Sequence, residues 1–154
     1  MNLGNRASNS QALQWKESYS VGVEELDLQH RKLLDLINEI ACLRSKGATE
    51  KTCFAVLNAM IKYAEMHFET EERYFGTSGY PDSPRHKRVH EEFVDEAFSM
   101  VRDLDENMLT LGAIAIYLQE WYKDHILGTD RKYMPFLVPK PAGADDAPEE
   151  IRVD

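Results

Sequence analysis

Residues 67–75 read HFETEERYF, which places a histidine and a glutamate four positions apart on one predicted helix face. Met60 and Ala64 precede them on that face, so His67 and Glu71 lie where a helix normally packs apolar side chains. No lysine or arginine shares this face near Glu71. Because burying an unpaired carboxylate costs several kcal/mol or neutralises it, the stretch predicts a helix whose buried face binds a partner for that charge.

Around this stretch, apolar residues recur with helical period in four segments. We expect helices over residues 24–44, over residues 49–76, from Pro84 after an N-cap at Ser83, and over residues 110–127. Met108 is assigned to the apolar face of the third helix, and Gly128 to the end of the fourth. Four such helices with short connections predict an all-α fold, an antiparallel up-down four-helix bundle.

The two ends of the chain differ in composition from the bundle. Residues 1–14 are expected to form a flexible N-terminal extension, and residues 15–138 the bundle itself. Residues 139–154 are proline-rich, acidic and poor in large apolar side chains, so we expect a disordered acidic tail.

Composition restricts the partners and the compartment. The formal net charge of −9 disfavours binding to nucleic acid and to anionic membranes. No apolar run approaches the roughly 20 residues of a membrane span, and the first residues lack the apolar segment of a signal peptide. Cys42 and Cys53 form no CxxC motif and are expected to be buried free thiols, with a disulfide across a helical hairpin as the alternative. We therefore expect a cytoplasmic protein.

The histidines carry the strongest functional signal. All five lie on predicted inward faces: His30, His67, His86, His90 and His125. Asp130 follows the last of them by five residues, where a loop is expected to fold it back. A single histidine on an apolar face is usually a core residue with one hydrogen-bond partner. A bound cation explains the whole set better, because it needs neutral imidazoles and ionised carboxylates in one place.

The motifs His67-x3-Glu71, His86-x3-His90 and His125-x4-Asp130, with a histidine at the end of DLQH, resemble the hemerythrin family in its single-domain bacterial form. Further matching residues are Trp15 before YSVGVEELDLQH, HF at 67, EE at 71, GYP at 79, tryptophan at 121 and HI at 125. The resemblance extends from Trp15 to Tyr133. It implies a four-helix bundle that encloses a non-haem di-iron centre.

The resemblance also implies a role for each ligand. His86, His90 and His125 would bind one iron, and His30 and His67 the other. Glu71 and Asp130 would bridge the two irons together with an oxo or hydroxo group. Two octahedral metals offer about twelve positions, and these ligands leave one position open, on the iron with two histidines. In the family, O2 binds there.

Two alternatives concern the chemistry of this site. Ferritin-like oxidases use mostly carboxylates and the Glu-x-x-His motif, which this sequence lacks. A nitrogen-rich site with one open position favours reversible binding over oxidation. Zinc or manganese in a similar cage remains the alternative to iron.

The resemblance further predicts an apolar O2 pocket, formed by Leu33, Phe68, Trp121, Tyr122 and Ile126. Simple core packing is the alternative role for these side chains. Tyr122 departs from the family, which usually carries leucine three residues before the last histidine. Its phenol is expected either to act at bound dioxygen, as a hydrogen-bond donor, cavity filler or electron and proton source, or to point aside with its hydroxyl in solvent.

The predicted function is reversible O2 binding for storage, delivery or buffering, in a protein that is not an enzyme. The alternatives are a di-iron enzyme that consumes peroxide or nitric oxide, and an oxygen or redox sensor. The expected partners are O2 and an unidentified reductase, and the chain is expected to be a monomer.

Overall fold

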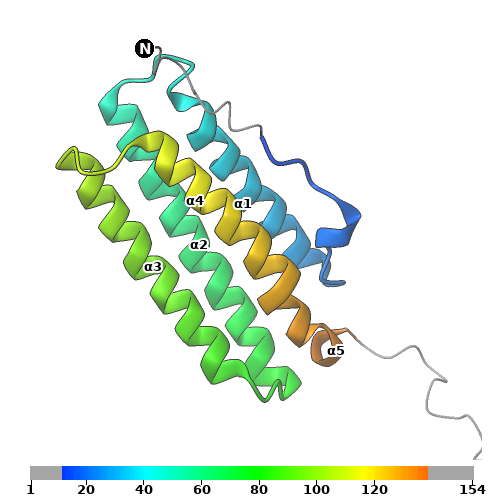
Figure 1. The fold of residues 1–154 in the computed structure, drawn as a ribbon. Helices are drawn as coiled ribbons and strands as arrows, with labels where there is room; N and C mark the ends of the chain where they lie inside the picture. The colour runs from blue at the N-terminus through cyan, green and yellow to red at the C-terminus, as the bar shows by residue number, and fades with distance from the viewer. Residues whose placement is uncertain (1–11, 139–154) are drawn as a thin grey trace, which may run out of the picture.

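Four long helices lie side by side in the structure, a computed structural model that describes residues 12–138 (Figure 1). They are α1 (Glu24–Leu43), α2 (Glu50–Ser78), α3 (Ser83–Asp105) and α4 (Leu111–Asp124). Short turns connect them, so consecutive helices run antiparallel, and the described residues contain no strand. The predicted antiparallel four-helix bundle is confirmed.

Four shorter elements flank these helices. The segment η1 (Glu17–Tyr19) precedes α1, and η2 (His125–Thr129), η3 (Asp130–Tyr133) and α5 (Met134–Leu137) continue the chain after α4. The expected tail at 139–154 and the first eleven residues of the expected extension lie outside the described residues. None of the described helices combines the length and the hydropathy needed to cross a membrane.

Local chemistry explains where α2 and α4 begin and where α2 ends. The side chains of Thr49 and Thr110 accept hydrogen bonds from backbone N–H groups in the first turns of α2 and α4. Gly79 follows α2 with a φ of 70°, in the left-handed region that glycine adopts without a steric penalty. The helix therefore continues past the predicted end at Gly76.

Both ends of α3 differ from the sequence prediction. The N-cap is Asp82 rather than Ser83, because the Asp82 carbonyl already accepts a helical hydrogen bond from the backbone N–H of His86. Met108 does not belong to the apolar face of this helix. Its side chain is 76% exposed because α3 ends at Asp105.

Buried apolar side chains form two clusters along the bundle. The large core includes Leu34, Ile37 and Ile40 of α1, Leu57, Met60 and Ile61 of α2, Phe93 and Ala97 of α3, and Ile114 and Leu118 of α4. The small core consists of Val21, Leu26, Phe75, Tyr80 and Tyr133. Along α1 and α2, the predicted ligands lie between these clusters. Cys42 and Cys53 are free thiols, as expected, but only partly buried.

The N-terminal arm is tied to the start of α1 by one carboxylate. Asp27 accepts hydrogen bonds from the Ser20 hydroxyl at 2.6 Å and from the Val21 N–H at 2.8 Å. These contacts hold Val21 against Leu26, so the arm closes the end of the bundle nearest the predicted ligands.

Candidate metal centre

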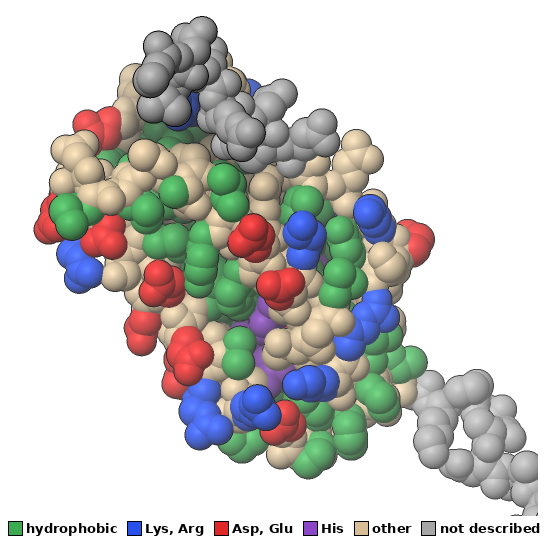
Figure 2. Space-filling model, viewed as in Figure 1, with side chains coloured by type: hydrophobic (Ala, Val, Ile, Leu, Met, Phe, Trp, Pro, Cys, Tyr) green, Lys and Arg blue, Asp and Glu red, His purple; other side chains and the backbone are tan. Residues whose placement is uncertain are grey.

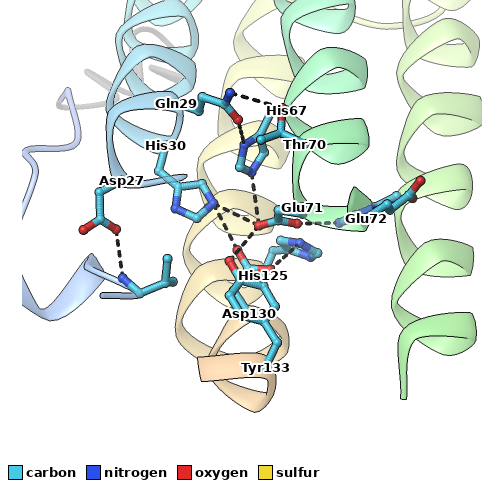
Figure 3. Close-up of polar contacts among 12 residues, drawn as sticks. Asp27, Gln29, His30, His67, Thr70, Glu71, Glu72, His125, Asp130 and Tyr133 are labelled. Carbon is cyan, nitrogen blue, oxygen red and sulfur yellow. Dashed lines mark hydrogen bonds and ion pairs between the residues drawn. The ribbon is translucent and has the colours of Figure 1, made fainter. Parts of the chain in front are cut away.

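Seven buried side chains from all four sides of the bundle meet between the two cores. Figure 3 labels five of them: His30, His67, Glu71, His125 and Asp130. The ligand-type residues are His30 on α1, His67 and Glu71 on α2, His86 and His90 on α3, His125 in η2 and Asp130 in η3. None of their side chains is more than 5% exposed. The structure thus brings together every residue that the sequence predicted as a ligand.

The backbone between His125 and Asp130 differs from the expected loop. It continues α4 as the π-helical segment η2, in which the N–H of Asp130 donates to the carbonyl of His125. In an α-helix, residues five apart point in different directions, whereas i→i+5 hydrogen bonding stacks them. The prediction that Gly128 ends the helix was therefore wrong, and the π-helix explains how a five-residue spacing directs both side chains into the site.

The two oxygens of Glu71 divide the imidazoles into two sets. Its Oε1 lies 3.3 Å from Nε2 of His30 and 3.2 Å from Nε2 of His67. Its Oε2 lies 3.6 Å from Nε2 of His86 and 3.1 Å from Nε2 of His90. One carboxylate therefore faces two separate groups of ring nitrogens, one with each oxygen.

Asp130, in the C-terminal part of the bundle, also faces imidazoles of both sets, with a different oxygen toward each set. Its Oδ2 lies 3.2 Å from Nε2 of His30, and its Oδ1 lies 3.1 Å from Nε2 of His86 and 2.9 Å from Nε2 of His125. We call His30 and His67 the two-histidine half, and His86, His90 and His125 the three-histidine half. Glu71 and Asp130 lie between the halves and contact both.

The donor atoms fit a pair of metal ions. All five Nε2 atoms, together with Glu71 Oε2 and both Asp130 carboxylate oxygens, are buried without a hydrogen-bond partner in the described part of the chain. Their nitrogen–oxygen separations of 2.9–3.6 Å match adjacent ligands of an octahedral ion, which lie about 3 Å apart when each bond is about 2.1 Å. Unpaired lone pairs converging at this spacing are what a metal site requires.

Protons compete with metal ions for these atoms. Burial lowers the pKa of His30, but the negative charges of the adjacent Asp130 and Glu71 outweigh burial and raise this pKa to about 9. The same balance raises the pKa of His86 to about 9. Burial raises the pKa of Glu71 and Asp130, yet the surrounding imidazoles hold both pKa values below the usual range. The two carboxylates therefore remain negative and attract cations.

The comparisons with known proteins agree with this geometry. The sequence profile described as "Hemerythrin HHE cation binding domain" matches residues 21–137. The chain belongs to the hemerythrin family. A hemerythrin-like protein of Naegleria gruberi is 33% identical over 124 residues, which cover 80% of this chain and 92% of the relative. A bacteriohemerythrin of Clostridium acetobutylicum is 28% identical over 78% of this chain and 97% of its own length.

A solved structure supports the fold assignment. The crystal structure of a wild-type hemerythrin superposes with a TM-score of 0.74 at 23% identity, covering 84% of this chain and all of the hemerythrin chain. This agreement, together with the family match, places the helical bundle and its histidine and carboxylate cluster in a family that binds non-haem iron and O2.

Three side chains that the sequence did not single out support the ligands of this hemerythrin-like centre. Tyr133 donates its phenolic proton to Glu71 Oε1 at 2.8 Å, and both groups are fully buried. Gln29 contacts Nδ1 of His67, and Glu72 contacts Nδ1 of the His90 ring. Tyr133 follows Asp130 by one helical turn, and this spacing could have indicated that Tyr133 lies near the ligands. The partners of Gln29 and Glu72 come from neighbouring helices, so no spacing in the sequence indicated these two contacts.

The predicted pocket residues of this family member all lie in or against the large core: Leu33, Phe68, Trp121, Tyr122 and Ile126. Phe68 stacks on the ring of His90 with centroids 3.8 Å apart, and Trp121 stacks on His125 at 4.4 Å. Both stacked rings therefore shield the three-histidine half. Their role in an O2 pocket stays a prediction.

Tyr122, the departure from the usual hemerythrin leucine, has a defined partner. Its side chain is 1% exposed, and its hydroxyl donates to the backbone carbonyl of His30 at 2.8 Å. The alternative in which the hydroxyl points into solvent was wrong, because α1 covers this face of α4. The single phenolic proton is therefore directed at the backbone of the two-histidine half. Burial raises the pKa of the Tyr122 phenol, so the hydroxyl keeps its proton and remains a hydrogen-bond donor.

Proposed function

We propose that this chain holds two iron ions joined by an oxo or hydroxo bridge and binds O2 reversibly, for storage, delivery or buffering. The observation that carries the proposal is the division of the carboxylate oxygens. Glu71 and Asp130 each present one oxygen to the two-histidine half and one to the three-histidine half. A carboxylate placed in this way would hold one cation with each oxygen.

In this proposal, His86, His90 and His125 would hold one ion, and His30 and His67 would hold the other. The unequal number of histidines supports one open position, in the two-histidine half. Such a centre supplies electrons to bound O2 and recovers them when O2 leaves. The protein contributes fixed imidazole orientations, two bridging carboxylates and dry surroundings.

The surroundings favour binding over turnover. Apolar and aromatic side chains of the large core, including Phe68 and Trp121, pack directly against the ligand rings. They cover the ligand rings, and none of the seven ligand-type side chains is more than 5% exposed. Among the described groups near the centre, the phenols of Tyr133 and Tyr122 already donate to Glu71 and to the His30 carbonyl. Neither proton is free for transfer to a ligand without breaking a hydrogen bond.

Metal analysis followed by gas exchange tests this function. Purified protein should contain two iron ions per chain. Reduced protein should develop a visible absorption band when O2 is admitted and lose it when O2 is withdrawn, over repeated cycles. Conversion in one direction only would contradict a carrier.

Two further assays separate the carrier from the alternatives. Steady turnover of hydrogen peroxide, or of nitric oxide under continuous reduction, would identify an enzyme instead. A partner protein that binds only the oxygenated or only the oxidised form would identify a sensor.

A further inference from the structure

Two of the five imidazoles, one in each half, contact a side chain that does not itself belong to the seven ligand-type residues. The Nδ1 atom of His67 contacts Gln29, and the Nδ1 atom of His90 contacts Glu72. Within residues 12–138, the Nδ1 atoms of His30, His86 and His125 have no hydrogen-bond partner. Each half therefore contains one histidine whose ring is oriented by a second residue.

A neutral amide orients the ring of His67. Gln29 Oε1 lies 2.8 Å from Nδ1 of His67, while Gln29 Nε2 donates to Thr70 Oγ1 at 3.2 Å (Figure 3). The Thr70 hydroxyl in turn donates to the carbonyl of Met66 at 3.0 Å. This chain fixes which end of the amide faces the ring, so Nδ1 of His67 must carry the proton and Nε2 is left to bind metal.

A carboxylate orients the ring of His90. Glu72 Oε1 lies 3.2 Å from Nδ1 of His90, and a carboxylate oxygen can only accept, so this Nδ1 also carries its proton. Glu72 is partly exposed, with 29% of its side chain accessible, and it lines a surface pocket of about 560 Å³ between α2 and α3. On the face shown in Figure 2, a small area of histidine surface is visible, with acidic and basic side chains close to it.

The two acceptors differ in charge. A carboxylate draws the Nδ1 proton toward itself and makes the imidazole a stronger donor through Nε2, whereas an amide carbonyl does so weakly. Residues that accept from a metal-binding histidine typically change metal affinity by roughly 10- to 100-fold. The contact to Glu72 is 0.4 Å longer than the contact to Gln29, as 3.2 Å compares with 2.8 Å, but it is the one that carries a full charge.

We propose that Glu72 and Gln29 are positioning residues that make the two halves unequal. The charge of Glu72 makes the three-histidine half bind its metal first and more tightly, and the neutral Gln29 leaves the two-histidine half as the weaker and later site. This inference rests on the proposed two-metal centre and assigns its order of loading.

Stepwise addition of Co2+ to the metal-free full-length protein tests the role of Glu72. The wild type should take up two Co2+ in two resolved steps of visible absorption. Glu72→Gln keeps an acceptor but removes the charge, and should weaken the first step by about 10-fold; Glu72→Ala should weaken it by up to about 100-fold. Glu69→Gln is the matched control, because Glu69 is exposed in the same pocket and has no described contact with a ligand. It should leave both steps within about twofold.

Gln29→Glu tests the same idea in the opposite direction. A carboxylate at this position still accepts from Nδ1 of His67, and it accepts from the Thr70 hydroxyl once that hydroxyl turns away from the Met66 carbonyl, so the second Co2+ step should strengthen by about 10-fold. An unchanged melting temperature of the metal-free variants would show that affinity, rather than folding, has changed.

The outcomes separate this inference from the proposed function. Two Co2+ bound in one unresolved step by the wild type, equal effects of Glu72→Gln and Glu69→Gln, or an unchanged second step in Gln29→Glu would overturn the inference while leaving a two-metal centre. Binding of fewer than two Co2+ by the wild type would overturn the two-metal centre, and the order of loading with it.

Discussion

The two ends of the bundle are built from the same four helices but are filled differently. One end contains the large core, where residues such as Ile37, Leu57 and Ile114 exclude water with apolar surface alone. The other end contains five histidines and two carboxylates under a small apolar cluster. The difference predicts two sources of stability: burial of apolar surface stabilises the first end, whereas the proposed metal ions would stabilise the second.

Removal of the metal should cause the largest loss of stability, and only at the end that contains the ligands. Each proposed ion, by binding only the folded chain, should contribute about 4 kcal/mol when free metal is 1,000 times its Kd. Hydrogen exchange should show lost protection around Glu71 and His125 after chelation, with protection around Leu57 retained. Equal loss at both ends would contradict the contrast between them.

The pH dependence of the metal-free protein should be the next largest effect. The pKa values of His30 and His86 rise from 6.5 to about 9 on folding. A raised pKa stabilises the folded state below pH 6.5, and this stability is lost as pH rises through 9, on the order of 3 kcal/mol for each group.

Thermal melting of the metal-free protein from pH 6.5 to 9.5 measures this loss. The metal-loaded protein should lack the decline, because bound metal needs neutral imidazoles. If the metal-free protein melts at the same temperature across this range, the raised pKa values of His30 and His86 are ruled out.

Leu57→Ala should weaken the end that contains the large core. The side chain is 1% exposed, and its loss should cost about 2–5 kcal/mol in urea unfolding. Metal content per chain should stay unchanged, because Leu57 contacts no ligand described here. Leu28→Ala, at a side chain that is 58% exposed, is the control and should change stability by about 0.5 kcal/mol or less. Lost metal in Leu57→Ala would mean that the two ends are coupled.

Tyr133→Phe should affect the end that contains the ligands. It removes the hydrogen bond to Glu71 and leaves a buried carboxylate oxygen without its donor, at a cost of about 1–3 kcal/mol. Tyr74→Phe is a matched control, since the Tyr74 hydroxyl bonds Glu25 at 2.7 Å on the surface. Equal unfolding energies for the two variants would show that Tyr133 does not support Glu71.

The smallest stability effect is expected at the boundary between the two ends, at Tyr122. Tyr122→Phe keeps the ring and loses only the bond to the His30 carbonyl, so it should cost about 1 kcal/mol. Tyr122→Leu, which restores the usual family residue, should change the autoxidation rate of the oxygenated protein. Identical rates in the wild type and Tyr122→Leu would exclude a role for this residue in the lifetime of the oxygenated form.

Much of the fold and the site was predictable because helical periodicity is local. The apolar positions of α1 and α2 and the i, i+4 pairs at His67 and His86 depend only on residues within two turns. Helix ends were less predictable. The choice between Gly76 and Gly79, and the continuation through Gly128, depend on which carbonyls find a partner in the folded chain.

By itself, the sequence determined the four-helix pattern and the seven ligand-type residues that face inward, because side-chain chemistry and spacing are written in the chain. Only the tertiary structure decided how Glu71 and Asp130 divide their oxygens between two sets of imidazoles, and that a π-helix rather than a loop directs Asp130 inward. It also decided the partners of Gln29, Glu72 and Tyr122. The contacts of Gln29, Glu72 and Tyr122, and most of those between the carboxylates and the imidazoles, join residues from different helices, so packing rather than sequence separation sets their distances. The π-helix is local, but the sequence pattern did not distinguish it from a loop.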